Sequence, residues 1–176
     1  MPLRPQDLLV LYKKAANPGV AMTYAELGEA LGLSASQVHR GVQRCLESGL
    51  AVQAGRGQWQ VVRSALIEFS LHGVRYVFPT KPGAQRRGLP TAYAAAPLKT
   101  EILSPPGDLP VWPHPEGTVK GSAIEPLCPQ APEAALRDER LYQMLALLDA
   151  LRIGRARERN LAGSLLKALI EAPDAP

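Results

Sequence analysis

YAELGEALGLSASQVHR, residues 24–40, is the stretch that decides the fold of this 176-residue chain. Thr23 precedes it and Glu26 stands three positions later, which is the spacing of a capping box at the start of a helix. Gly32 ends that helix, because glycine lacks the Cβ that would clash in a sharp turn. Ser34 then caps the next helix. The stretch therefore predicts two helices joined by a tight turn.

The helix that follows Ser34 is predicted to run to about Ser48 and to have one buried face. Apolar side chains recur along it at three- and four-residue steps, at Val38, Val42 and Cys45. The intervening positions are polar or basic. This second helix therefore has a polar face that is free to meet something outside the protein.

Further elements are predicted on both sides of this pair. An earlier helix covers Pro5 to Ala16, where proline suits the first turn. A glycine-rich turn at 54–57 separates two short alternating runs, 50–53 and 58–62, which is typical of a β-hairpin. A further helix is expected from Ser64 to His72.

This order of elements resembles the winged helix-turn-helix of MarR- and ArsR-like bacterial regulators. The resemblance covers about residues 5–72 and depends on Ala-Glu-Leu at 25–27, Leu-Gly-Leu-Ser at 31–34 and the polar-faced helix after them. It implies that this helix enters the major groove of duplex DNA and that the hairpin touches the backbone or minor groove.

Several side chains are candidates for DNA contact. Ser36 and the helix N-terminus can hold a phosphate, Gln37 can pair with adenine, and Arg40 can pair with guanine. Arg56 is expected at the hairpin tip. The alternative is that these groups form an ordinary solvated helix face. The full candidate set is Ser34, Ser36, Gln37, His39, Arg40, Gln43, Arg44, Arg56, Tyr24, Lys13 and Lys14.

Charge and composition agree with such a partner without requiring it. The net charge is +4, and residues 1–63 hold seven Lys and Arg against four Asp and Glu. A basic region suits a polyanion. Hydrophobic residues make up 46% of the chain, and no apolar run approaches the length that spans a bilayer. With two distant cysteines and no signal-peptide pattern, we expect a cytoplasmic, nucleoid-associated protein.

The rest of the chain divides into two regions. Residues 73–131 hold eleven of the seventeen prolines and are predicted as a loop segment with short strands, one of them at 73–78. Residues 132–176 predict two helices, Glu133 to Leu151 and Arg155 to Glu171, that dimerise or bind a partner. The expected fold is mainly α with a small β-hairpin, in three parts: 1–72, 73–131 and 132–176.

Further basic residues are best explained as a solvated surface, and the alternative is a secondary site for DNA phosphates or an acidic partner. They are Arg86, Arg87, Arg152, Arg155 and Arg159.

The sequence gives little evidence that the protein is an enzyme. It has no glycine-rich phosphate loop, nucleophile elbow or Ser/His/Asp grouping. His114 lies beside a carboxylate, but no second ligand stands at metal-binding spacing. We therefore expect no catalytic residue, metal or cofactor, and the alternative of an active site in the proline-rich segment is weak.

The sequence thus predicts a non-enzymatic, sequence-specific regulator of transcription that binds double-stranded DNA as a homodimer and acts as a repressor. The main alternative is an antitoxin or adaptor that binds a partner protein through its middle and C-terminal regions.

Overall fold

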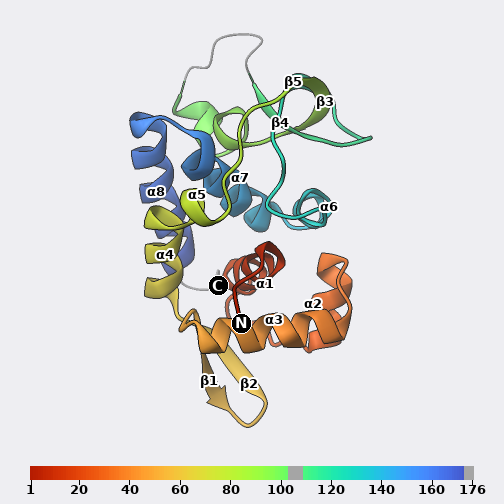
Figure 1. Cartoon of the computed structure of the whole chain (residues 1–176), viewed down its shortest axis with the longest axis vertical. Coiled ribbons are helices and arrows are strands. Elements are labelled where there is room, and N and C mark those ends of the chain that lie inside the picture. The colour runs from red at the N-terminus through yellow and green to blue at the C-terminus, as the bar shows by residue number, and fades with distance from the viewer. Residues whose placement is uncertain (103–108, 173–176) are drawn as a thin grey trace.

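The computed structural model describes residues 1–102 and 109–172. In this part the chain is mainly helical, with a two-stranded hairpin and a three-stranded sheet (Figure 1). The predicted mainly α class is confirmed at this level. The portions of the predicted middle and C-terminal regions at 103–108 and 173–176 lie outside the described residues.

The first three helices lie close to their predicted bounds. The two caps inferred from sequence are present: Thr23 Oγ1 accepts from the Glu26 N–H at 3.2 Å, and Ser34 Oγ accepts from the Gln37 N–H at 3.1 Å. Gly32 adopts φ 69°, the left-handed conformation that turns the chain between the helices. These helices are α1 (Pro5–Ala16), α2 (Tyr24–Leu31) and α3 (Ala35–Glu47).

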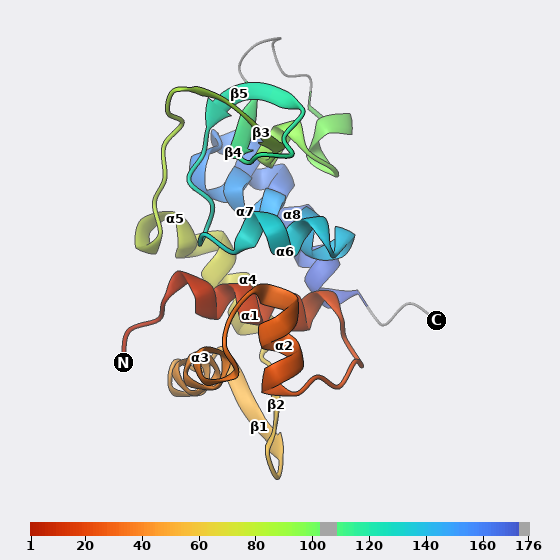
Figure 2. The same ribbon diagram turned by 90° about the vertical axis from the view of Figure 1, so that its right-hand side faces the viewer.

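The predicted hairpin and the helix after it are also present. β1 (Ala51–Gly55) pairs antiparallel with β2 (Gln58–Val61), and α4 (Arg63–His72) follows. The hairpin projects from the end of the molecule beside α3, away from the other elements (Figures 1 and 2).

The strand predicted at 73–78 is wrong, because this segment forms the short helix α5 (Val74–Val77). The Phe78 N–H donates to the Val74 carbonyl at 2.8 Å, which closes a helical turn. That turn buries Val74 completely and sets the Phe78 ring edge-on to Phe69, 6.4 Å away. Packing against α4 thus overrides the β propensity of these residues.

The short strands predicted in the proline-rich segment are present, and they pair with one another. Its strands are β3 (Gln85–Pro90), β4 (Pro110–Pro113) and β5 (Val119–Ala123), and each pairs with the other two to close a small ring. Close approach requires glycine here, since a Cβ on Gly88 would lie 2.0 Å from the Trp112 carbonyl oxygen. Two 3-10 turns, Ala92–Ala94 and Leu98–Thr100, precede β4.

The helix predicted from Glu133 to Leu151 is two helices. They are α6 (Ala131–Leu136) and α7 (Glu139–Ile153). Asp138 separates them: its backbone is extended and its Oδ1 accepts from the Leu141 N–H at 3.1 Å, so it begins α7 as an N-cap. The second predicted helix, Arg155 to Glu171, is present as α8 (Ala156–Glu171), and Gly154 separates it from α7.

One core joins the three predicted regions. α1 lies at its centre, with Leu8, Leu9 and Leu11 fully buried, and packs against both α3 and α7. The same hydrophobic cluster continues through Trp112 to Leu148. The N-terminal elements therefore share one hydrophobic core with the rest of the described chain.

A buried polar network ties α7 to the strand ring. Asp149 Oδ2 accepts from Thr91 Oγ1 at 2.7 Å and from Trp112 Nε1 at 2.6 Å, while its Oδ1 accepts from Arg152 at 2.8 Å. Arg152 also donates to the carbonyls of Phe78 and Glu125. Burial raises the pKa of Asp149 above its ordinary value, and the bonds from Arg152, Thr91 and Trp112 offset part of that effect.

Candidate nucleic-acid interface

An accessible face lies at the end of the molecule, formed by α3 and the hairpin. The exposed side chains of α3 include Ser36, His39 and Arg40, and Arg56 lies in the hairpin turn. We call this the α3–hairpin face. Figures 1 and 2 show no described segment of the proline-rich region over it.

Two opposite faces of α3 explain how it is presented. Val38, Val42 and Cys45 are fully buried against α1, α2 and β1. Ser36, Arg40 and half-buried Gln43 follow one another at four- and three-residue steps and form an outward stripe. The packing of the apolar face of α3 therefore determines which residues are exposed on its opposite face.

Arg40 is the cation at the centre of this stripe. Its side chain is exposed, and none of the described residues gives its guanidinium a hydrogen bond or ion pair. His39 beside it is exposed as well and sets its ring edge-on to Tyr24, 5.2 Å between centroids. Arg40 is thus free to meet an acceptor outside the protein.

The side chains of Ser34 and Gln37 each bond to the backbone N–H of the other residue. The Gln37 Oε1 accepts from the Ser34 N–H at 2.8 Å, which completes the capping box at the start of α3. A bidentate contact with adenine needs both the oxygen and the nitrogen of this amide. In this conformation the oxygen already accepts one bond, so a bidentate contact would share it between the cap and the base.

The expectation that Arg44 is available for DNA contact is wrong. Its side chain is 4% exposed and bonds to Asp7 on α1, with Nε to Oδ2 and a terminal nitrogen to Oδ1 both at 2.7 Å. The hydrogen bond to Asp7 raises the pKa of Arg44 above its ordinary value. Arg44 therefore holds α3 on α1 and is unavailable to DNA.

The two lysines of α1 are also engaged inside the protein. Lys13 Nζ donates to Asp138 Oδ2 at 2.6 Å, and both side chains are largely buried. Lys14 Nζ donates to the Val20 carbonyl at 2.9 Å and lies 5.9 Å from the centroid of the Trp59 ring. Lys13 was a candidate for DNA contact, but its largely buried ion pair joins α1 to the start of α7 instead.

The secondary basic residues do not form one cluster. Arg152 is buried in the Asp149 network, which contradicts its predicted surface role. Arg159 donates to the Gly154 carbonyl at 2.7 Å, and Arg155 is exposed at the start of α8. Arg86 and Arg87 are exposed on β3.

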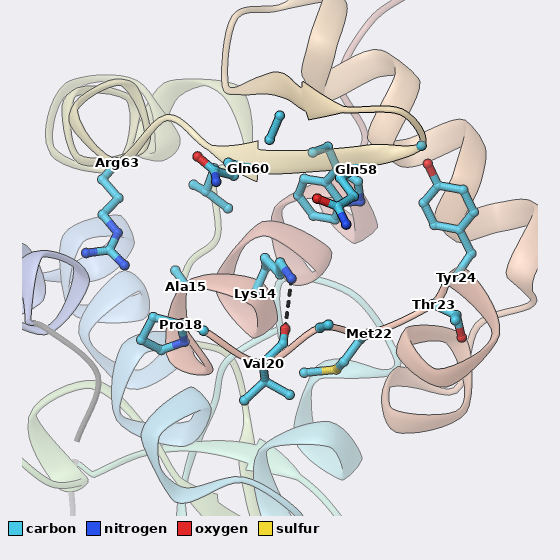
Figure 3. A pocket seen from close by; sticks show the side chains of 16 residues that line it. Lys14, Ala15, Pro18, Val20, Met22, Thr23, Tyr24, Gln58, Gln60 and Arg63 are labelled. Atoms are coloured by element: carbon cyan, nitrogen blue, oxygen red, sulfur yellow. Dashed lines mark hydrogen bonds between the residues drawn. The ribbon is translucent and has the colours of Figure 1, made fainter. Parts of the chain in front are cut away.

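Sequence reasoning missed two charged residues near the α3–hairpin face. Arg63, exposed at the start of α4, lies near β2 (Figure 3). Glu47 continues the α3 stripe and is exposed; its Oε2 lies 3.1 Å from the Met1 nitrogen. A carboxylate there would repel an anion, so the part of this stripe that is open to an anionic group is the first three turns of α3. The spacing of seven residues from Arg40 and four from Gln43 could have placed Glu47 on this stripe.

Neither cysteine offers a reactive thiolate. Burial raises the pKa of Cys45 to about 12 and that of Cys128 to about 11. Both thiols are therefore protonated near neutral pH, when nucleophilic or redox chemistry needs the thiolate. Residues 1–102 and 109–172 also contain no group of three or more His, Cys, Asp and Glu side chains placed to hold a metal ion.

Comparison of the chain with protein-family models, curated proteins and solved structures found no match. No helix in the described part of the chain is both long and apolar enough to cross a bilayer. The functional argument therefore depends on the geometry of the α3–hairpin face.

Proposed function

We propose that residues 5–72 form a winged helix-turn-helix and that the protein binds duplex DNA through the α3–hairpin face. The observation that carries this proposal is the exposed, unpaired Arg40 on a helix that stands beside a projecting hairpin with Arg56 in its turn. A helix is about 10–12 Å wide with its side chains. The major groove is about 12 Å wide, so α3 fits it.

The roles of the individual residues follow from this placement. Arg40 donates to the O6 and N7 acceptors of guanine, while Ser36 and Gln43 contact phosphate or base edges on either side of it. Arg56 contacts the backbone or minor groove beyond the edge of the major groove. Tyr24, held by His39, lies at the N-terminus of α2, where it can reach a phosphate.

Regulation is the proposed consequence of this binding. In the cytoplasm, a homodimer would place two α3 helices in successive major grooves, about 34 Å apart along the duplex, and repress transcription by covering a promoter. The oligomeric state is measurable by sedimentation velocity, with and without the selected duplex. A protein that stays monomeric on its duplex would contradict the dimer.

The direct test is selection of random duplexes at two salt concentrations, followed by sequencing. We expect a recurring motif with the wild-type protein and a weaker or altered motif with Arg40→Ala. Arg157→Ala is a matched control, since Arg157 is exposed on α8, away from the face. A failure of the wild-type protein to enrich any sequence, or equal motifs from all three proteins, would reject specific DNA binding.

A second candidate function is that of an adaptor or antitoxin, and one observation favours it. Arg87 on β3 lies directly opposite Lys120 on β5, and no described residue pairs with either side chain. Two like charges in register destabilise a sheet unless an anion lies between them. An acidic partner protein would supply that anion, and co-purification with such a partner from the native host would support this function.

A further inference from the structure

A second basic surface lies at the end of the molecule opposite the α3–hairpin face. Both views place β3, β4 and β5 at one end of the long axis and α3 with the hairpin at the other (Figures 1 and 2). Its exposed cations are Arg86 and Arg87 on β3 and Lys120 on β5. We call this surface the β3–β5 face. The protein therefore carries exposed cations at both ends of its long axis.

No carboxylate balances the charge of the β3–β5 face. Residues 79–90 and 117–124, which contain β3 and β5, include no Asp or Glu. Glu116 and Glu125 flank the second segment, and neither forms an ion pair with the three cations in the part of the chain that the structure describes. The positive charge of this face is therefore open to an external anion.

The three cations project from both sides of a two-stranded ribbon. β3 and β5 pair antiparallel, with Arg87 directly opposite Lys120 and Arg86 opposite Gly121. Successive side chains of a strand point to opposite faces, so Arg86 points away from Arg87 and Lys120. The major groove of duplex DNA admits a two-stranded β-ribbon, and a phosphate backbone runs along each of its rims. The ribbon therefore presents a cation toward each rim.

The side chains of this face favour a duplex over other anionic partners. Stable protein interfaces depend on buried aromatic or apolar anchors, and none of the exposed large apolar side chains in the described chain lies in 79–90 or 117–124. Single-stranded nucleic acid stacks its bases on aromatic side chains, and these segments contain none. The phosphate backbone of a duplex is bound through charge and therefore fits the face best.

We propose that the β3–β5 face binds the phosphate backbone of a second DNA duplex, so that one protein joins two duplexes. Arg87 and Lys120 contact one rim of a groove, and Arg86 contacts the other. A phosphate beside Arg87 and Lys120 also relieves the repulsion between these like charges in register. The joining of two duplexes rests on the proposed function of the α3–hairpin face, whereas binding at the β3–β5 face does not.

The stiffness of DNA makes the second duplex necessary. The persistence length of a duplex is about 150 base pairs, so a short duplex stays nearly straight. Since the two basic faces lie at opposite ends of the molecule, a straight duplex bound at one of them does not reach the other (Figures 1 and 2). Occupation of both faces therefore requires two duplexes or two distant segments of one long DNA.

Labelling with ¹⁵N-glycine provides a separate reporter for each face. The chain has 15 glycines, among them Gly121 on β5 and Gly57 in the hairpin turn beside Arg56. The probe is a short duplex of arbitrary sequence, added to the full chain. We expect the amide signals of Gly121 and Gly57 to shift saturably and with different affinities, because they report two independent sites.

Charge substitutions test the contacts at the β3–β5 face. Arg87→Gln and Lys120→Gln should each weaken the affinity reported by Gly121 about eightfold at about 0.1 M salt, since each phosphate contact contributes about 0.9 to the salt slope. The affinity reported by Gly57 should stay unchanged. Arg157→Gln is the matched control and should leave the affinity at Gly121 as it is. No shift at Gly121, or equal affinities for the wild type and both variants, would overturn the proposal.

Capture of a fluorescent duplex by protein held on an immobilised duplex measures the joining itself. The wild-type protein should capture the second duplex. The double variant Arg87→Gln/Lys120→Gln should lose most of this capture and still bind the immobilised duplex. A homodimer that uses two α3–hairpin faces would also capture a second duplex, but its capture would survive the double variant. Undiminished capture by that variant would therefore reject joining through the β3–β5 face.

Two further outcomes identify the partner and separate this proposal from the proposed function. If poly-glutamate binds at Gly121 as tightly as the duplex, the face recognises an acidic protein and the proposal fails. If the duplex shifts Gly121 but not Gly57, binding at the β3–β5 face stands, while the joining is rejected together with DNA binding by the α3–hairpin face. If both signals shift and the double variant loses capture, both halves of the proposal stand.

Discussion

Asp7 on α1 and Arg44 on α3 form a buried, two-point ion pair in which both N–O distances are 2.7 Å. Asp7 Oδ2 also accepts from the Arg4 N–H at 2.8 Å, which caps the start of α1. Gly41 leaves room for this carboxylate, since a Cβ there would lie 2.7 Å from Asp7 Oδ1. One pair thus links the first helix to the helix whose other face is proposed to meet DNA.

Removing one member of this pair should strongly destabilise the protein. We expect Asp7→Asn or Arg44→Met to lower the free energy of unfolding by about 3–5 kcal/mol, because each leaves an uncompensated buried group. Urea unfolding followed by circular dichroism measures the change. The double variant Asp7→Leu/Arg44→Met should recover much of the loss, since it removes both charges together. A double variant as unstable as the sum of the single ones would contradict this account.

The same pair shows what sequence reasoning could and could not predict. Local patterns gave the caps at Thr23 and Ser34 and the apolar face of α3, because these depend on residues within one or two turns. Arg44 looked like an outward cation, since its partner lies 37 positions away in another helix. Tertiary pairing of that kind leaves no local pattern.

The second half of the chain illustrates the same limit. The helix cap at Asp138 was not predicted, because the leucines at 136 and 141 continue a helical pattern across the break between α6 and α7. The pairing of β3, β4 and β5 into a ring was not predicted from the sequence. These strands are short and pair across long separations, and proline interrupts their alternation of apolar and polar residues. For the α3–hairpin face, the sequence correctly placed Arg40 and Arg56 at exposed positions, while the ion pair of Glu47 with the Met1 nitrogen required the tertiary structure.

Arg40→Ala should weaken binding to a selected duplex by about 1–3 kcal/mol and relax the preference at one base pair, because it removes a bidentate base contact. Fluorescence anisotropy with the selected duplex and its single-base variants measures both effects. Arg157→Ala removes a charge elsewhere and should retain the full preference. If Arg40→Ala lowers affinity equally for every duplex, Arg40 contacts phosphate and not a base.

Arg56→Ala should lower affinity by a similar factor for all sequences. Each phosphate contact contributes about 0.9 to the slope of log affinity against log salt concentration, so the slope should become shallower by about that amount. Titrations at several salt concentrations measure it. An unchanged slope would show that the hairpin turn stays away from the DNA backbone.

Asp138 should make the stability of the protein depend on pH. Burial raises the pKa of this carboxyl, but hydrogen bonds from Lys13, Asn17 and the Leu141 N–H outweigh it, and the pKa lies below its ordinary value of 3.8. Well above pH 3.8 the carboxyl is ionised in the unfolded chain as well as in the folded one, and the stabilisation is complete. As the pH falls below that value, the unfolded chain takes up a proton first and the stabilisation is lost.

Asp138→Asn isolates this charge, because asparagine caps a helix about as well as aspartate. We expect it to cost about 2 kcal/mol at pH 7, the usual contribution of a hydrogen bond to a charged group. The difference from wild type should shrink as the pH falls from 5 to about 2, measured by urea unfolding at each pH. If the stability difference between Asp138→Asn and the wild type stays constant over that range, the substitution acts through packing and not through charge.

Arg87 and Lys120 provide a test in which a substitution is expected to stabilise the protein. The two residues are opposite each other in the antiparallel pair of β3 and β5, and both side chains are exposed. Lys120→Gln should raise the free energy of unfolding by about 0.2–1 kcal/mol at low salt, by removing a like charge in register. At 1 M salt the Debye length falls to about 3 Å, so the gain should disappear.

Arg86→Gln is the matched control for this effect. Arg86 is exposed on the same strand, but its partner in register is Gly121, so it lacks a charge directly opposite. We expect little change in stability from this control at either salt concentration. Equal gains from both variants would reflect the net positive charge of the whole protein and not the Arg87–Lys120 pair. In that case the argument for an acidic partner at this end of the molecule would lose its support.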